Sequence, residues 1–291
     1  MWFTRSASRN ERAQPPALLL GYAVTMELIG PSSGAIIDPE NGGRLASFQV
    51  EGVELLVHTG ASEFDWGCYP MVPWAGRVRE GRFEWAGETH ALPINMPPHA
   101  IHGTVFNRTW ERVDATTLRC TLGPDWPWKG EVRSVFSMDD RAFHWRMEVH
   151  AADSPFPAMI GWHPWFRRSL GTRGPATLRF RPGRMHRRDE DGIPSGDMVK
   201  PTEGPWDDCF SDLAGPPVLV WPEGIALEVR STCQDWVVYD EPSHALCIEP
   251  QSGAPNAFNR GAPDVVRPGR PLIHTMSFRW TVQESGAKRP R

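Results

Sequence analysis

Apolar and β-branched residues occur along this chain in short runs, and glycine, proline, asparagine or aspartate separates one run from the next. Within residues 143–149 apolar and polar positions alternate, which is typical of a strand with one buried face. We predict strands at residues 26–29, 35–37, 44–50, 54–57, 82–85, 88–91, 109–113, 117–122, 131–138, 142–150, 176–180, 218–220, 225–230, 236–239, 245–249 and 272–281. Hardly any window shows a helical period, so the pattern predicts an all-β fold, either a sandwich or a barrel.

Turn residues and composition predict how the chain is divided. Ala86-Gly87 lies between two predicted strands and predicts a hairpin. Residues 184–205 are rich in charge, glycine and proline, which predicts a long loop. No internal repeat or shift in composition marks a boundary. We therefore predict one domain over residues 26–283, with residues 1–25 as a loose N-terminal extension and residues 284–291 as a frayed tail.

The composition fits a globular protein and excludes two classes of partner. Of the 291 residues, 40% are hydrophobic and 23% are charged, and the formal net charge is -4. This balance does not provide the basic face that nucleic-acid binding needs. The longest apolar run, residues 17–24, is far shorter than the ~20 residues of a membrane-spanning helix. Arginines precede this run, but the small-x-small cleavage site of a signal peptide is missing.

The cysteines indicate the redox compartment. They are odd in number, widely spaced and without C-x-x-C or zinc-site spacing: Cys68, Cys120, Cys209, Cys233 and Cys247. We interpret them as reduced thiols of a cytoplasmic protein.

The stretch Gly-Trp-His-Pro-Trp-Phe at residues 161–166 places an ionisable imidazole between two tryptophans. Pro164 restricts its own φ and favours an extended backbone at His163. Histidine is the side chain that both gives and takes a proton near neutral pH. Trp162 and Trp165 could stack on a sugar ring or pack in the core, and His163 could itself be a core histidine.

Four more polar residues stand in apolar or turn-like surroundings. They are Arg77 after Pro-Trp-Ala-Gly, His102 before Gly103, Asp207 after Trp206, and Glu249 at the end of an apolar strand. Such settings are typical of the wall of an aromatic-lined cleft. Each residue also has an ordinary interpretation, as a solvated strand residue or a turn cap. Glu249 and His163 together would suffice for proton transfer in two directions.

The order of these motifs resembles that of the aldose 1-epimerase (galactose mutarotase) family over nearly the whole chain. The motifs are Pro-Trp-Ala-Gly-Arg77-Val, Gly81-Arg82-Phe83 with Gly87, Ala-Ile-His102-Gly, His163-Pro-Trp-Phe, Asp207-Asp-Cys-Phe, and Ile-Glu249-Pro-Gln with Pro255-Asn256-Ala257 and Asn259. Each motif alone is short and weakly specific, whereas six in this order are strong evidence.

The resemblance implies a large antiparallel β-sandwich, a galactose mutarotase-like supersandwich with an open sugar-binding cleft. It implies interconversion of the α and β anomers of a free aldose, with Glu249 as general base and His163 as general acid. His102, Arg77 and Asp207 would bind the sugar. The implied reaction belongs to carbohydrate metabolism and needs no metal or organic cofactor. We expect a monosaccharide as the only partner, and a monomer or a weak homodimer.

The sequence departs from the family pattern at three places. Gly76-Arg77 replaces the common Asn-Arg, His102-Gly103-Thr104 replaces His-Gly-Gly, and Glu249-Pro250-Gln251 replaces Glu-Thr-Gln. These changes lie on the substrate side of the implied cleft, so they concern the identity of the sugar. For the acid role, we expect Glu249 or Asp207 to keep His163 protonated at neutral pH.

Other functions remain open at this point. A hexose-phosphate 1-epimerase of similar fold would hold the phosphate with arginines, either Arg77, Arg79 and Arg82 or Arg167 and Arg168. A carbohydrate-binding β-sandwich would need no acid and base, and a glycosidase could use Asp207 and Glu249 as its two carboxylates. A cupin-like metal site would recruit His99, His102, His163 and Glu249.

Overall fold

The computed structural model of the protein describes residues 25–260 and 263–283. The predicted extension, apart from Thr25, and the predicted tail at residues 284–291 lie outside these ranges. The regular structure within them consists of strands and two short 3-10 segments, η1 (Arg79–Gly81) and η2 (Ala257–Arg260). No helix in this part of the chain is long and apolar enough to cross a membrane.

The larger of two main sheets contains eleven strands of the described chain. Its order is β1 (Met26–Ile29), β2 (Ser33–Asp38), β3 (Arg44–Val50), β5 (Cys68–Met71), β15 (Gly161–Arg167), β23 (Ala245–Gln251), β22 (Asp235–Tyr239), β19 (Asp207–Ser211), β17 (Arg184–Arg188) and β18 (Pro194–Val199), with β4 (Val53–Glu54) beside β3. Paired strands run antiparallel throughout.

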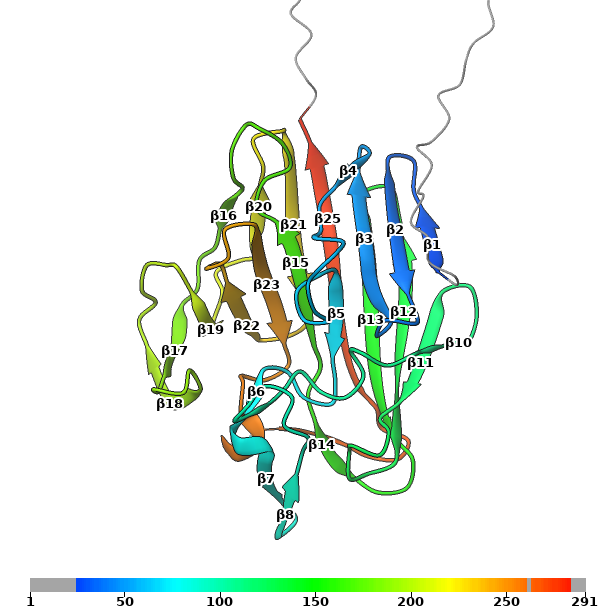
Figure 1. The fold of residues 1–291 in the computed structure, drawn as a ribbon, viewed down its shortest axis with the longest axis vertical. Coiled ribbons are helices and arrows are strands. Elements are labelled where there is room, and N and C mark those ends of the chain that lie inside the picture. Colours follow the sequence, from blue (N-terminus) through cyan, green and yellow to red (C-terminus); the bar gives the residue numbers. More distant parts are fainter. Residues whose placement is uncertain (1–24, 261–262, 284–291) are drawn as a thin grey trace, which may run out of the picture.

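The second sheet contains eight strands and is also antiparallel. Its order is β10 (Glu111–Arg112), β11 (Thr117–Thr121), β12 (Gly130–Met138), β13 (Ala142–Ala151), β25 (Leu272–Val282), β21 (Ile225–Ser231), β20 (Val218–Val220) and β16 (Thr177–Arg179). Three small pairs complete the fold: β6 (Arg77–Val78) with β9 (Ala100–Ile101), β7 (Arg82–Trp85) with β8 (Glu88–Ala91), and β14 (Phe156–Ala158) with β24 (Asp264–Val266). In Figure 1 the labels β6, β7, β8 and β14 gather at the lower end of the two layers.

Aromatic side chains fill the space between the two sheets. The ring centroid of Phe48 on β3 lies 5.5 Å from those of Phe278 and Trp280 on β25. Trp162 on β15 meets Trp145 on β13 edge-on at 6.3 Å. All five are buried, and one buried phenylalanine contributes about 1.5–3 kcal/mol. This core confirms the expected β-sandwich.

The alternation of side chains along β15 places Trp162 and Trp165, which lie on either side of Pro164, on opposite faces of the sheet. Successive side chains of a strand point to opposite faces. Trp162 therefore packs into the core, where it meets Trp145. His163 and Trp165 lie on the other face of the sheet, and both line a cleft there. His163 is thus a cleft residue, and the opposite face of its strand packs against the core.

Most predicted strands agree with the observed ones, and residues 26–29, 44–50, 82–85, 88–91 and 218–220 match residue for residue. The prediction of a long loop at residues 184–205 is wrong, because residues 184–199 form the hairpin of β17 and β18. These two strands end the larger sheet and carry mostly polar or charged side chains, so no apolar alternation marks them. Backbone pairing of β17 with β19 holds them in the sheet.

Candidate active site

One cleft of about 310 Å³ receives all five polar side chains that the sequence indicated: Arg77, His102, His163, Asp207 and Glu249. The larger sheet supplies three of them, from β15, β19 and β23, while β6 and the segment after β9 supply Arg77 and His102. Small-molecule sites span roughly 300–1,000 Å³. This cleft is at the lower end of that range, which suits a ligand of the size of a monosaccharide.

Sheet register places His163 beside Glu249. In the antiparallel pair of β15 and β23, Gly161 lies opposite Gln251, so two residues further along His163 lies opposite Glu249. The distance from Nε2 of His163 to Oε1 of Glu249 is 3.2 Å. The two residues are 6% and 2% exposed. A buried imidazole and a buried carboxyl group therefore share one hydrogen-bonding contact on the floor of the cleft.

Aromatic stacking sets the orientation of the His163 ring. Tyr69, which lies opposite His163 on β5, stacks on one side at a centroid distance of 4.8 Å. Trp165 is nearly parallel to the imidazole at 5.4 Å, and His102 meets it edge-on at 5.1 Å. With these neighbours packed against it, the imidazole keeps Nε2 directed at Glu249.

Burial controls the protonation of this pair. Removal from water lowers the pKa of His163, and the nearby Arg44 guanidinium lowers it further. Burial also raises the pKa of Glu249 well above its usual value, and the carboxylate of Asp207 adds to this effect. Both changes favour a neutral pair that holds one proton.

The expectation that a carboxylate keeps His163 protonated in the free protein is therefore wrong. The carboxylate is present at 3.2 Å, but both groups are buried, and burial disfavours two separate charges. Burial therefore favours placing the proton of the pair on Glu249. An ionic state, with imidazolium and carboxylate, is reached by moving that one proton across the contact.

His102 reaches the cleft through an unusual backbone conformation. Its φ is 62°, in the left-handed region, and the following Gly103 has φ 83°. A Cβ on Gly103 would lie 2.0 Å from the carbonyl oxygen of Val72, so only glycine fits there. Burial, His163 and Arg77 all lower the pKa of His102, which keeps this imidazole neutral. Its buried Nδ1 has no hydrogen-bond partner among the described residues.

Asp207 joins two guanidinium groups at the wall of the cleft. Its Oδ2 lies 3.8 Å from Nη1 of Arg77 and accepts a hydrogen bond from Nη1 of Arg188 at 3.2 Å. Nε of Arg188 also pairs with Oδ1 of Asp208 at 2.9 Å. Burial raises the pKa of Asp207, while both arginines lower it. The group forms a polar, partly exposed surface beside the buried pair.

The cleft also contains residues that sequence analysis did not single out. Gln251 lies two residues beyond Glu249 on the same face of β23 and donates a hydrogen bond from Nε2 to Oε2 of Glu249 at 3.3 Å. Its place in the Ile-Glu-Pro-Gln motif was the available signal. Arg188 comes from the segment predicted to be a loop, and nothing in its run of charges distinguishes it from Arg187.

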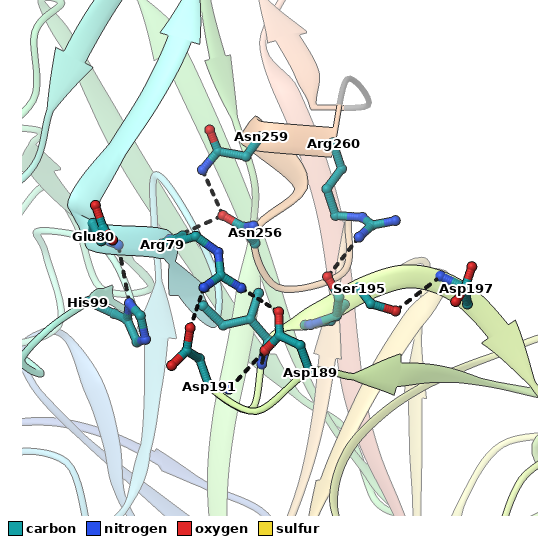
Figure 2. Close-up of polar contacts among 12 residues, drawn as sticks. Arg79, Glu80, His99, Asp189, Asp191, Ser195, Asp197, Asn256, Asn259 and Arg260 are labelled. Carbon is teal, nitrogen blue, oxygen red and sulfur yellow. Dashed lines mark hydrogen bonds and ion pairs between the residues drawn. The ribbon is translucent and has the colours of Figure 1, made fainter.

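Of the four residues that the alternative metal site would use, three line the cleft: His102, His163 and Glu249. His99 lies outside the group, because its Nδ1 accepts a hydrogen bond from the backbone amide of Glu80 (Figure 2). Two of the arginines proposed for a phosphate bind other groups of the protein. Arg79 binds Asp189 and Asp191, and Arg168 donates to backbone carbonyls near residue 240.

Comparison with known proteins agrees with this fold. The family described as aldose 1-epimerase matches residues 26–212, more than half of the chain. The uncharacterized protein YihR of Escherichia coli K12 is 27% identical over 227 residues, which cover 66% of this chain and 71% of YihR. A galactose mutarotase-like protein from Clostridium acetobutylicum has a TM-score of 0.77 at 14% identity, with 88% of this chain and 95% of that chain covered. Galactose 1-epimerase from Lactobacillus acidophilus has a TM-score of 0.71 at 16% identity, with 89% and 94% covered.

The fold is that of the galactose mutarotase-like β-sandwiches. The family match is more specific, and the chain belongs to the aldose 1-epimerase family.

Proposed function

We propose that the protein is an aldose 1-epimerase, which interconverts the α and β anomers of a free aldose. The observation that carries this proposal is the buried contact of 3.2 Å between His163 and Glu249 in a cleft of monosaccharide size. A hemiacetal ring opens when one group takes a proton from the C1 hydroxyl and another gives a proton to the ring oxygen. An imidazole beside a carboxyl group supplies both.

In this mechanism the ionic state of the pair acts on the cyclic sugar. The carboxylate of Glu249 takes the proton of the C1 hydroxyl, the C1 oxygen forms the carbonyl double bond, and the bond from C1 to the ring oxygen breaks. The imidazolium of His163 gives its proton to that ring oxygen. The open aldehyde then turns about C1–C2, and closure reverses both transfers. The pair holds one proton before and after each step, so the atoms balance without exchange with water.

Burial assists ring opening in this scheme. The ionic pair becomes neutral as the ring opens, and a buried site disfavours separated charges. The same environment raises the pKa of Glu249 and lowers that of His163. The cyclic form of an aldose is more stable than the open aldehyde, so the ring closes again and the pair returns to its ionic state. Each proton transfer of this kind contributes about 10²–10⁴-fold.

The remaining cleft residues would orient the sugar. His102 and Gln251 line the cleft, and Nδ1 of His102 and Oε1 of Gln251 are buried without a hydrogen-bond partner in the described chain. Arg77 and Asp207 present a donor and an acceptor side by side, which suits a pair of neighbouring hydroxyl groups. Orientation matters because the ring oxygen and the C1 hydroxyl must meet His163 and Glu249 at the same time.

An anomerisation assay tests the proposed function. Fresh α-D-galactose, α-D-glucose and pentoses are dissolved with the protein, and the approach to anomeric equilibrium is followed by polarimetry or NMR. We expect acceleration over the spontaneous rate for at least one free aldose. If none is accelerated, the proposal is wrong.

The pH dependence provides a separate prediction. The active pair holds one proton. At low pH a second proton would bind to His163, and burial lowers the pKa of this residue. The acidic limb of kcat/KM should therefore lie below the usual histidine value of ~6.5. Loss of the single proton requires a higher pH, because the pKa of Glu249 is raised. We expect kcat/KM, corrected for spontaneous anomerisation, to stay constant through the neutral range. A fall centred near 6.5 as the pH rises would instead indicate an independent imidazolium.

A hexose-phosphate 1-epimerase is the second candidate, and the charges of the cleft disfavour it. Carboxyl groups outnumber guanidinium groups among the lining residues, which include Asp65, Asp207, Asp208, Glu241 and Glu249 against Arg77 and Arg188. Both arginines already face carboxylates. We expect glucose 6-phosphate to be a poorer substrate than glucose in the same assay.

Release of nitrophenol from nitrophenyl glycosides would support the glycosidase alternative, and we expect none.

A further inference from the structure

The hairpin of β17 and β18 forms one wall of the candidate active site. Arg188, Gly192 and Pro194 of this hairpin line the cleft together with the residues of the central strands. Arg188 is the last residue of β17, and the register of β17 with β18 shifts between His186 and Arg188. Bulges of this kind re-aim a side chain and are frequent next to active sites. The irregularity therefore lies where an arginine turns toward the cleft.

The contacts of Arg188 leave part of its guanidinium available. Nη1 donates to Asp207 and Nε pairs with Asp208. No hydrogen bond or ion pair joins Nη2 to any residue of the ranges that the structure describes. The side chain of Arg188 is 32% exposed, so it faces the open part of the cleft. A guanidinium held by two carboxylates is a rigid donor for oxygen atoms of a ligand.

The position of Arg188 defines which end of a sugar it would meet. Asp207, its partner, stands on β19, and β22 separates that strand from Glu249 on β23. Two strand spacings correspond to about 10 Å. The acid and base act on C1 and the ring oxygen, so Arg188 lies toward the opposite end of a bound monosaccharide.

The hairpin is held in place by contacts from a different part of the fold (Figure 2). Arg79 of η1 binds both Asp189 and Asp191 at the tip of the hairpin. Asp189 in turn accepts hydrogen bonds from the backbone amides of Asp191 and Ile193, at 3.0 and 3.1 Å. From η2, Nη1 of Arg260 donates to the carbonyl oxygen of Pro194 at 2.7 Å.

Arg79 is itself anchored. Its backbone amide donates to Oδ1 of Asn256 at 3.1 Å, and the same oxygen accepts a hydrogen bond from Asn259. Arg79 does not line the cleft. Its side chain binds the tip of the hairpin, and Arg188 immediately precedes that tip.

We propose that Arg188 is a specificity-determining residue that donates hydrogen bonds to hydroxyl oxygens at the end of the sugar remote from C1, and that Arg79 is the positioning residue that holds the hairpin carrying it. This inference rests on the proposed function for the orientation of the sugar. It adds a recognition element that lies outside the acid–base pair.

Binding measurements on Arg188 variants test the first part. Affinity for D-glucose, D-galactose and their 4-deoxy and 6-deoxy analogues is measured by isothermal titration calorimetry, with kcat and KM from the anomerisation assay. For Arg188→Met we expect affinity for the best-bound sugar to fall about 10-fold or more, since bonds to charged groups are the stronger ones. KM should rise while kcat changes little, and the penalty for at least one deoxy analogue should shrink. Arg188→Lys should recover part of the affinity.

The matched control is Arg187→Met on the same strand. The Arg187 side chain is 61% exposed, and its Nε lies 4.0 Å from Asp197 within the hairpin. We expect unchanged affinity. If Arg188→Met binds every sugar as the wild type does, or lowers kcat with KM unchanged, the role of Arg188 is refuted. Thermal unfolding of each variant confirms that the fold is retained.

A double-mutant cycle tests the positioning role of Arg79. Arg79→Gln should raise KM in the same direction as Arg188→Met, and Arg79→Lys should recover part of the loss. The key readout is the double variant, which should bind sugar no more weakly than Arg188→Met alone, because Arg79 acts through Arg188. Additive losses would mean a general structural role and would overturn this part.

The outcomes for the two proposals are distinguishable. Sugar binding without anomerisation by the wild type contradicts the proposed function and leaves the binding test of Arg188 valid. Anomerisation with no effect of Arg188 contradicts the inference alone. If no sugar binds, both proposals are wrong.

Discussion

Replacing Glu249 with glutamine is expected to lower kcat for anomerisation by about 10²–10⁴-fold, the usual contribution of one acid–base group. Glutamine keeps the shape of the side chain but neither takes nor gives a proton at this position. His163, 3.2 Å away, would lose the partner that shares its proton. The sugar-binding groups Arg77, His102 and Asp207 remain, so the affinity for sugar should change little.

Polarimetry on fresh α-anomers gives the rate, and calorimetry gives the affinity of the same variant. Glu54→Gln is the matched control, because Glu54 is also largely buried but lies outside the cleft, where it accepts hydrogen bonds from the amides of Phe48 and Leu56. This control should cost stability and leave kcat unchanged. An undiminished rate in Glu249→Gln would show that Glu249 is not the base.

The second large effect is expected at Arg44, a buried arginine on β3 that is 1% exposed. Its guanidinium donates to the carbonyl oxygens of Asn41, Trp66, Glu63 and Phe106. In Arg44→Met four hydrogen bonds from a charged donor are lost, each worth about 1.5–3 kcal/mol, and the carbonyl oxygen of Phe106 is left buried without that donor. We expect the free energy of unfolding to fall by at least about 3 kcal/mol.

Arg44 also supports the site from behind. Its guanidinium carbon lies 4.0 Å from the ring centroid of Trp66 and 5.4 Å from that of Tyr69, the residue that stacks on His163. Denaturant unfolding measures the loss. Arg119→Met on β11 serves as control, since its exposed ion pair with Glu111 should contribute less than about 1 kcal/mol. Equal stability of both variants would contradict the structural role of Arg44.

Local signals in the chain were sufficient for much of the sheet. Ala86-Gly87 predicted the hairpin of β7 and β8, and both residues have positive φ, 53° and 84°. The alternation near residue 145 predicted β13, whose apolar residues face the core. Such features depend on neighbouring residues only, so they can be predicted from a single sequence.

The protonation state of His163 and Glu249 could not be predicted from the sequence. The sequence indicated that His163 and Glu249 act together, but they are far apart along the chain, and the register of β15 with β23 brings them to 3.2 Å. The carboxylate expected to protonate His163 is present, yet burial favours a neutral pair. The depth of a group below the surface depends on the packing of both sheets, which local sequence does not report.

The sequence by itself determined the all-β class, most strand positions and the five polar residues of the cleft, because period-2 patterns, turn residues and short motifs are read directly along the chain. Only the tertiary structure decided that Trp162 enters the core while Trp165 faces the cleft. It also decided that residues 184–199 form a wall of that cleft rather than a free loop. The physical reason is that the contacts of this hairpin come from Arg79, Arg260 and β19, which are distant in the chain and become neighbours only in the folded protein.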